Sequence, residues 1–255
     1  MKMAKIYSFM LFLLMLLIWE AVVQLKEIPK IILPAPTAIG ANMVQHFQSG
    51  YFYPHIAATS IEVFGGFFAG AILGIGLGFL VAQSKRTQDI IQPYIIASQA
   101  MPKLALAPLL VLWFGFGYTP KIVIVALVCF FPLFENTVTG LSNVSRDKLA
   151  LFHSLKATQT QTLLKLRLPS AMPYIFSGLR VAIVLSVVGA VISEFIGANK
   201  GLGALIIASQ GMLDTTLMFS VFILLTAKGI ILYQSIHWIE AAFFKKYSYS
   251  RGEMK

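Results

Sequence analysis

A chain of 255 residues in which 58% are hydrophobic and only 12% charged is too apolar for a soluble domain, because soluble domains carry about 25% charged residues. The net charge of +10 would suit a nucleic-acid-binding protein only if the basic residues gathered on one folded face. They fall instead between long apolar runs, so we expect them to set the orientation in a membrane and expect no nucleic-acid partner.

The sequence also lacks the residue sets that catalysis, metal binding or a cofactor would need. Cys129 is the single cysteine and lies inside an apolar run, and no Cys/His cluster has metal-ligand spacing. The segment "GANKGLG" (197–203) does not match a phosphate-binding loop. We therefore expect no enzyme activity, no metal and no cofactor.

The first predicted element is the apolar run 6–25. A helix needs about 20 mainly apolar residues to cross a membrane, and this run is long enough. Lys2 and Lys5 precede it, a pattern that secretory signal peptides share. No small-x-small cleavage site follows, and the apolar run continues past Glu20, so a membrane span is favoured over a signal peptide.

The next three apolar segments are 60–82, 90–116 and 120–141. The first of them places Gly66, Gly70, Gly74 and Gly78 on one helix face, where a neighbouring backbone can approach closely. The second carries three prolines, so we expect a kinked or broken crossing in place of a straight helix.

A polar, basic connection, 142–170, separates the fourth and fifth apolar segments. Ser145 is predicted to cap a short helix, with Asp147 in its first turn, where a negative charge suits the helix dipole. Thr158 is predicted to cap a second short helix, with Gln161 completing a capping box. The pattern predicts two helices that meet at a turn outside the membrane.

The first of these two helices is amphipathic. Leu151, Phe152 and Leu155 share one face, edged by Lys and Arg. One alternative is that this face packs against other loops, but the loops on the same side are too short to cover it. We therefore predict that residues 146–167 dock a soluble partner.

The chain ends with two more long apolar segments, 171–196 and 216–240, the second interrupted by Lys228. Between them, "GLGALIIASQG" (201–211) is too short to span, and such a piece is tolerated at membrane depth only if it is buried in protein. The whole pattern predicts an all-α integral membrane protein, with one domain over 1–255 and about six transmembrane helices.

Lysine and arginine counts predict the orientation of these six spans, because cytoplasmic loops carry an excess of both. With the N-terminus in the cytoplasm, the C-terminus returns there and the cytoplasmic side holds Lys2, Lys5, Lys85, Arg86, Arg146, Lys148, Lys156, Lys165, Arg167, Lys245, Lys246, Arg251 and Lys255. The opposite side holds only Lys26, Lys30, Lys121 and Lys200. Both termini and the 142–170 connection are therefore predicted to be cytoplasmic.

Five polar residues within the predicted spans stand out as candidates for function: Lys103, Glu135, Asn136, Glu194 and Lys228. Charges inside a membrane are costly and indicate function by default. The alternative for Lys103, Glu135 and Lys228 is that they pair or extend to an interface and serve packing.

The connection 142–170 resembles the coupling loop of ATP-binding cassette importer permeases, E-A-A-x-x-x-G followed by nine residues and I-x-L-P. Leu168 and Pro169 match the final L-P, and Leu166 matches the apolar position before it. The E-A-A positions and the motif's glycine, which precedes Ala157, fall on Ala150, Leu151, Phe152 and Lys156. The acidic residue and the glycine of the motif are thus both replaced in this chain.

Other strings resemble one branch of these permeases, which carry nitrate, sulfonates, taurine and pyrimidine precursors of thiamine. They are "ILPAPTAI", "LAPLLVLWFGFG" (106–117), "LPSAMPYIFSGLRVA" (168–182) and "SEFIGANKGLGALI" (193–206). The string "MPKLALAPL" (101–109) is most similar to the thiamine-precursor and riboflavin types.

This resemblance implies a homodimeric pore in a bacterial cytoplasmic membrane, two cytoplasmic ATP-binding subunits and an extracytoplasmic substrate-binding protein. It assigns the contact with the ATP-binding subunit to Ala150, Leu151, Phe152, Leu155, Lys156, Ala157, Leu168 and Pro169. It places Glu194 beside the "GLG" segment near the solute path, where Glu135, Asn136 and Lys103 are further candidates.

Two other functions compete with this interpretation. A secondary transporter driven by an ion gradient would predict internal repeats and paired broken helices, neither of which the sequence contains. An intramembrane enzyme would need a nucleophile and base or a metal set, whereas the histidines are scattered along the chain. The expected function is that of a permease subunit without chemistry of its own.

Overall fold

The structure is a computed structural model that describes residues 2–252, without the side chains of residues 2, 4, 5, 104 and 246–252. All regular elements of the described chain are helices, and it contains no strand. Its elements are α1 (Lys2–Leu25), α2 (Pro36–Gln48), α3 (Phe52–Val81), α4 (Lys85–Ala100), the 3-10 turn η1 (Lys103–Leu106), α5 (Ala107–Phe114), α6 (Tyr118–Ser142), α7 (Arg146–Ser154), α8 (Gln159–Thr162), the π-helical turn η2 (Leu163–Arg167), α9 (Leu168–Glu194), α10 (Leu202–Gly211) and α11 (Thr215–Gly252).

Five helical stretches among the described residues are long and apolar enough to cross a membrane: Ile6–Leu25, Phe52–Val81, Tyr118–Ser142, Gln159–Glu194 and Thr215–Lys245. They overlap five of the six predicted spans. The sixth, 90–116, is not a continuous helix, because α4 ends at an extended Met101 before Pro102, and η1 and α5 then continue as a short helical stretch that ends at Gly115. The break at Pro102 matches the effect expected of a proline, which removes a backbone donor and clashes with the preceding turn, whereas Pro93 stays inside α4 and Pro108 lies in the first turn of α5.

The broken segment still returns the chain across the molecule. A Cβ on Gly66 would lie 2.3 Å from Val125 Cβ, and one on Gly78 would lie 2.9 Å from Thr137 Cβ. Residue numbers rise together along both helices, so α3 and α6 are parallel and their backbones nearly touch. Because α3 and α6 run in the same direction, both begin at the same end of the molecule, so α4, η1 and α5 must carry the chain back to the end where α3 began.

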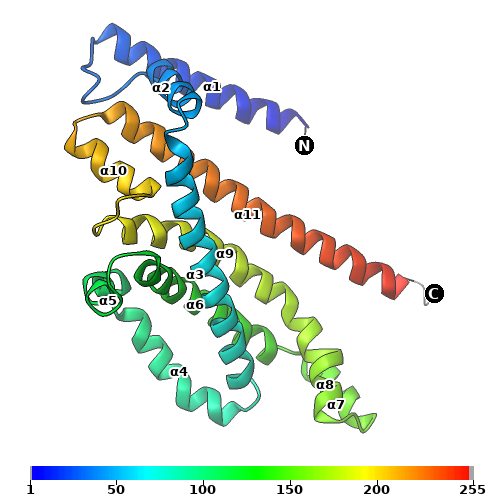
Figure 1. The fold of residues 1–255 in the computed structure, drawn as a ribbon. Coiled ribbons are helices and arrows are strands. Elements are labelled where there is room, and N and C mark those ends of the chain that lie inside the picture. The colour runs from blue at the N-terminus through cyan, green and yellow to red at the C-terminus, as the bar shows by residue number, and fades with distance from the viewer. Residues whose placement is uncertain (1, 253–255) are drawn as a thin grey trace.

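The later helices alternate in direction around this pair (Figure 1). Gly140 of α6 packs on Ala171 of α9, whereas Gly189 packs on Val125, so α6 and α9 are antiparallel. Arg180 of α9 pairs with Glu240 of α11 at 2.7 Å. The α7–α8 turn, the 82–85 corner and Lys245 thus lie at one end, called here the hairpin end, and α10 lies at the opposite α10 end.

The basic residues lie unequally at these two ends. Those described at the hairpin end are Lys85, Arg86, Arg146, Lys148, Lys156, Lys165, Arg167 and Lys245, and those at the α10 end are Lys26, Lys30, Lys121 and Lys200. The side chains of Lys2, Lys5, Lys246 and Arg251, and the whole of Lys255, lie outside the described part of the chain.

The core lies between α3, α6 and α9, where Val63, Phe67, Cys129, Leu133 and Ile183 are buried together. By contrast, α1 lies away from this core (Figure 1), and α11 packs against it along one side only; both helices expose apolar side chains over much of their length. Exposed apolar surface of this extent fits a lipid environment or a further protein surface.

Candidate functional site

The hairpin of α7, α8 and η2 forms as the local sequence predicts. The Ser145 hydroxyl accepts a hydrogen bond from the Lys148 amide at 3.4 Å, which caps α7. Thr158 and Gln161 form the predicted capping box, with amide-to-side-chain distances of 3.2 and 2.9 Å. Each cap satisfies backbone donors that a helix start leaves free, so both short helices have defined beginnings.

The turn between the two helices keeps the geometry that glycine usually supplies. Lys156 has a φ of 52°. Its amide donates to the His153 carbonyl at 2.9 Å, and the Ala157 amide donates to the Phe152 carbonyl at 3.0 Å. This pair of bonds is a Schellman motif with Lys156 at its left-handed position. The tight turn therefore remains in place, with a strained backbone, although lysine stands where the coupling motif has glycine.

The hairpin presents apolar side chains away from the core helices. Leu151 is 57% exposed and Leu155 is 68% exposed, whereas Phe152 and Ala157 are partly buried. Ala150 and Lys156 are exposed, and Leu168 and Pro169 begin α9. The predicted contact residues on the hairpin therefore share one short structure that continues directly into a long core helix.

A second cluster of polar residues lies at the α10 end, inside the protein. Gly201, Leu202 and Gly203 begin α10, and each of their amides has a side-chain acceptor. The Gly201 amide donates to His55 Nδ1 at 3.2 Å, and the Leu202 amide donates to the Thr59 hydroxyl at 2.8 Å. The Gly203 amide and the Thr59 hydroxyl both donate to the Glu194 carboxylate.

This arrangement makes Glu194 the capping anion of α10. An anion at a helix N-terminus interacts favourably with the helix dipole and the free amides. A Cβ on Gly201 would lie 2.2 Å from Glu194 Cδ, and a Cβ on Gly203 would lie 2.4 Å from the Val191 carbonyl oxygen. The "GLG" sequence is thus required by the close approach of the backbone to the carboxylate.

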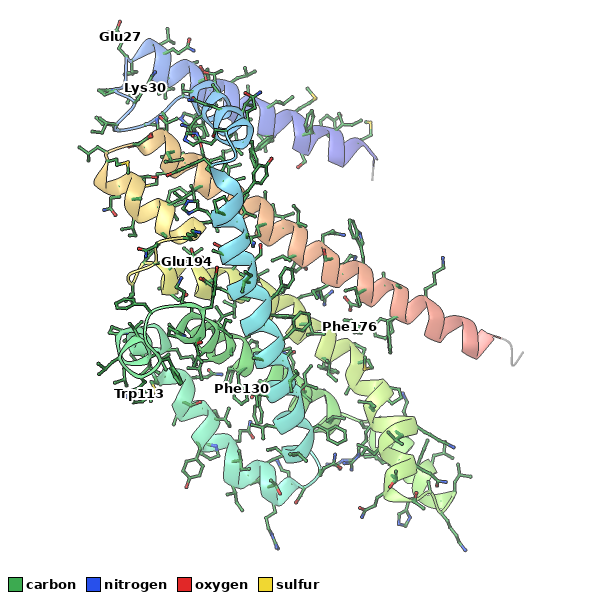
Figure 2. All side chains as sticks on the ribbon, in the orientation of Figure 1. Glu27, Lys30, Trp113, Phe130, Phe176 and Glu194 are labelled. Carbon is green, nitrogen blue, oxygen red and sulfur yellow. The ribbon has the colours of Figure 1, made fainter. Side chains whose placement is uncertain are left out.

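Glu62 and Lys121 form a buried ion pair beside this cap. Glu62 Oε1 accepts from Lys121 Nζ at 2.7 Å, and their side chains are 0% and 12% exposed. The second oxygen, Oε2, has no hydrogen-bond partner among the described residues. The pair joins α3 to α6 one turn from Thr59, and Figure 2 shows Glu194 in the interior between α3 and α10.

The structure does not gather the four predicted solute-path residues into one site. Glu194 lies beside "GLG", as expected, but it is 1% exposed and both of its oxygens bind inside the chain. Asn136 packs on Gly178, which lies sixteen residues before Glu194 on α9, about 24 Å along the helix axis. Glu135, its neighbour, and Lys103, in η1, are partly exposed. Their place on a solute path stays a prediction.

Sequence reasoning missed Glu62 and its partner. Glu62 lies inside an apolar span, so the signal that selected Glu135 and Glu194 applied to it equally. Lys121 was counted only as an orientation charge. Lys228, left open between function and packing, donates to the Ser60 hydroxyl on α3. It therefore joins α11 to the same helix that carries Thr59 and Glu62.

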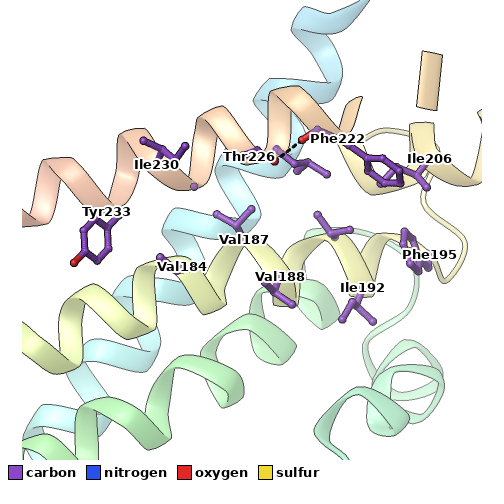
Figure 3. A pocket seen from close by; sticks show the side chains of 13 residues that line it. Val184, Val187, Val188, Ile192, Phe195, Ile206, Phe222, Thr226, Ile230 and Tyr233 are labelled. Carbon is purple, nitrogen blue, oxygen red and sulfur yellow. Dashed lines mark hydrogen bonds between the residues drawn. The ribbon is translucent and has the colours of Figure 1, made fainter. Parts of the chain in front are cut away.

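A groove of about 570 Å³ runs between α9 and α11 (Figure 3). Its walls are valine, isoleucine, leucine and phenylalanine side chains with two hydroxyl-bearing residues, Thr226 and Tyr233. The Thr226 hydroxyl donates to the Phe222 carbonyl of its own helix at 2.8 Å. A polar solute needs well-placed hydrogen-bond partners, which this groove does not provide.

Comparison with known proteins gives consistent matches along most of the chain. Residues 66–249 match the family described as binding-protein-dependent transport system inner membrane component. The riboflavin transport system permease protein of Chloroflexus aurantiacus is 35% identical over 220 residues, covering 86% of this chain and 82% of that protein. The formylaminopyrimidine transport permease protein of Halalkalibacterium halodurans is 34% identical over 229 residues, covering 90% and 91%.

The fold is also similar to that of a solved transporter chain. A chain of the methionine ABC transporter MetNI, in an inward-facing conformation, superposes with a TM-score of 0.63 at 18% identity. The match covers 72% of this chain and 92% of that chain.

Proposed function

The chain belongs to the family of binding-protein-dependent transport system inner membrane components, the permeases of ATP-binding cassette importers, and we propose that two copies form one translocation pore. The observation that carries this proposal is the capped hairpin 146–167, which exposes Leu151 and Leu155 and leads directly into Leu168 and Pro169 at the start of α9. Two ATP-binding subunits dock on the two hairpins, and a substrate-binding protein delivers the solute at the α10 end.

The hairpin end faces the cytoplasm in this proposal. Its excess of Lys and Arg over the α10 end supports that orientation. The membrane is the bacterial cytoplasmic membrane, and both termini are cytoplasmic.

Coupling follows from the way the hairpin joins the core. The π turn η2 leads from α8 into α9 without a loop, and α9 packs along α6 and α3. ATP-driven closure of the two bound subunits draws the hairpins together, and α9 transmits that displacement to the core. The pore then switches between inward-open and outward-open states, while the permease does no chemistry itself.

The proposed solute is a pyrimidine precursor of thiamine or a riboflavin-like compound. The named riboflavin and formylaminopyrimidine permeases, at 35% and 34% identity, support this class. Sulfonates, taurine and nitrate are the remaining solutes of the same branch. A secondary transporter driven by an ion gradient is the alternative mechanism.

Co-purification followed by uptake tests the proposal. The chain should be isolated together with an ATP-binding subunit, and vesicles holding both should take up a labelled formylaminopyrimidine or riboflavin only when ATP and the substrate-binding protein are supplied. Uptake that follows an imposed proton or sodium gradient without ATP would support the secondary transporter instead.

A further inference from the structure

A hollow of about 400 Å³ lies where the hairpin meets the end of α3. Its wall comes from α7, the turn, α8 and η2, and one residue comes from the corner after α3. The lining residues are Gln83, Leu149, His153, Ala157, Gln159, Thr162, Leu163 and Arg167. The hollow therefore touches both the projecting hairpin and the core.

Arg167 is the charged group of this hollow that carries no counter-ion. It is partly buried, and within the described residues its guanidinium makes no hydrogen bond and no ion pair. No carboxylate lines the hollow, whereas amide, imidazole and hydroxyl groups do. A guanidinium presents several donors in a fixed fork that fits a carboxylate with two parallel hydrogen bonds.

The rest of the hairpin has the same charge bias. Arg146, Lys148, Lys156, Lys165 and Arg167 stand against one acidic residue, Asp147, and the position of the acidic residue in the coupling motif is Ala150. Surfaces that associate specifically are arranged so that positive patches meet negative ones. The partner of this hairpin should therefore be acidic where it meets the hollow.

We propose that the hollow receives an aspartate or glutamate side chain of the docked ATP-binding subunit, held by two hydrogen bonds from Arg167. This inference rests on the proposed function, because it assumes that such a subunit docks on the hairpin. The seated carboxylate lies against Gln83 as well as the hairpin, so the partner contacts the end of α3 directly. A membrane lipid phosphate is the competing anion, and it would approach Arg167 from the bilayer.

The test compares two single-charge removals made two residues apart in η2. Arg167→Gln removes the guanidinium from the hollow, and Lys165→Gln removes an exposed charge that does not line it. Each chain is placed in nanodiscs of neutral phosphatidylcholine, and its affinity for the co-purifying ATP-binding subunit is measured. Arg167→Gln should weaken binding by about 10- to 100-fold, since hydrogen bonds to charged groups contribute that much. Lys165→Gln should weaken it by less than about threefold.

Several outcomes decide between the alternatives. Arg167→Lys keeps the charge but loses the fork, so it should recover only part of the affinity. Unchanged binding by Arg167→Gln would overturn the assignment of the hollow and leave the proposed function intact.

A loss of binding seen only in nanodiscs with phosphatidylglycerol would also overturn the assignment of the hollow, because the anion at Arg167 would then be a lipid. A wild-type chain that binds no ATP-binding subunit would overturn the proposed function itself. Equal melting temperatures of the variants and wild type exclude misfolding.

Discussion

The hairpin end and the α10 end of the molecule are built on opposite principles. At the hairpin end, caps and a Schellman turn within about 20 residues define the structure, and its side chains remain exposed. At the α10 end, residues from α3, α6, α9 and α10 meet in the interior through buried hydrogen bonds and an ion pair. An exposed, locally specified element is free to bind a partner, whereas the buried cluster holds the core helices together.

The largest expected effect separates two glycines of α10. Gly201→Ala should destabilise the protein by up to about 5 kcal/mol, because a φ of 135° is strained for alanine and its Cβ would overlap the Glu194 carboxylate. Gly211→Ala, at the other end of the same helix, meets nothing within 4 Å and should be harmless. Cys129 is buried, so its labelling by a thiol dye during heating reports unfolding. Equal melting temperatures for the two variants would contradict the cap.

The next effect compares a buried ion pair with an exposed one. Glu62→Gln should cost about 3 kcal/mol, since it leaves the Lys121 ammonium buried without a counter-ion. Asp89→Asn, which breaks the exposed Lys85–Asp89 pair at the hairpin end, should change stability by less than about 0.5 kcal/mol.

A double variant sharpens this comparison. Glu62→Leu with Lys121→Met should recover most of the stability lost by Glu62→Gln, because apolar replacement of a whole buried pair is often neutral. Chemical or thermal unfolding followed through Cys129 measures all of these variants. If the double variant is no more stable than Glu62→Gln, the two residues do not act as a pair.

The smallest effect belongs to the hairpin turn. Lys156→Gly should stabilise the turn by up to about 1 kcal/mol, because glycine adopts the observed φ of 52° without the steric cost that a side chain brings. Slower hydrogen exchange at the amides of Lys156 and Ala157 would report this, with the global melting temperature unchanged. Ser154→Gly, in the last helical position of α7, should speed that exchange. Faster exchange in the Lys156→Gly protein would argue against a strained turn.

Features that depend on neighbouring residues in the chain were predictable, and those that depend on helix register were not. Ser145, Thr158 and Gln161 cap their helices through contacts three residues away, so the sequence alone identified them. Glu62 and Lys121 are 59 residues apart and meet because α3 and α6 pack in parallel. The broken crossing that makes these helices parallel was expected from its prolines. The sequence did not predict which residues of α3 and α6 lie opposite each other.

The glycines illustrate both cases. Their four-residue spacing in α3 predicted a close helix contact, and α6 supplies it. The need for glycine in "GLG" became visible only when Glu194 was found against its backbone, since the distance between a carboxylate and a backbone depends on how α9 and α10 fold together.

The central claim is that the hairpin couples this permease to ATP hydrolysis, and solute-stimulated hydrolysis by the reconstituted complex tests it most directly. Phe152→Asp places a charge in the proposed apolar contact and should abolish the stimulation, because an unpaired buried charge weakens binding by roughly a thousandfold or more. Phe152→Leu keeps the contact apolar and should retain most of the stimulation of hydrolysis. The claim predicts a Phe152→Asp protein that inserts and folds normally but neither stimulates hydrolysis nor takes up solute. Hydrolysis and uptake at wild-type levels in that protein would contradict it.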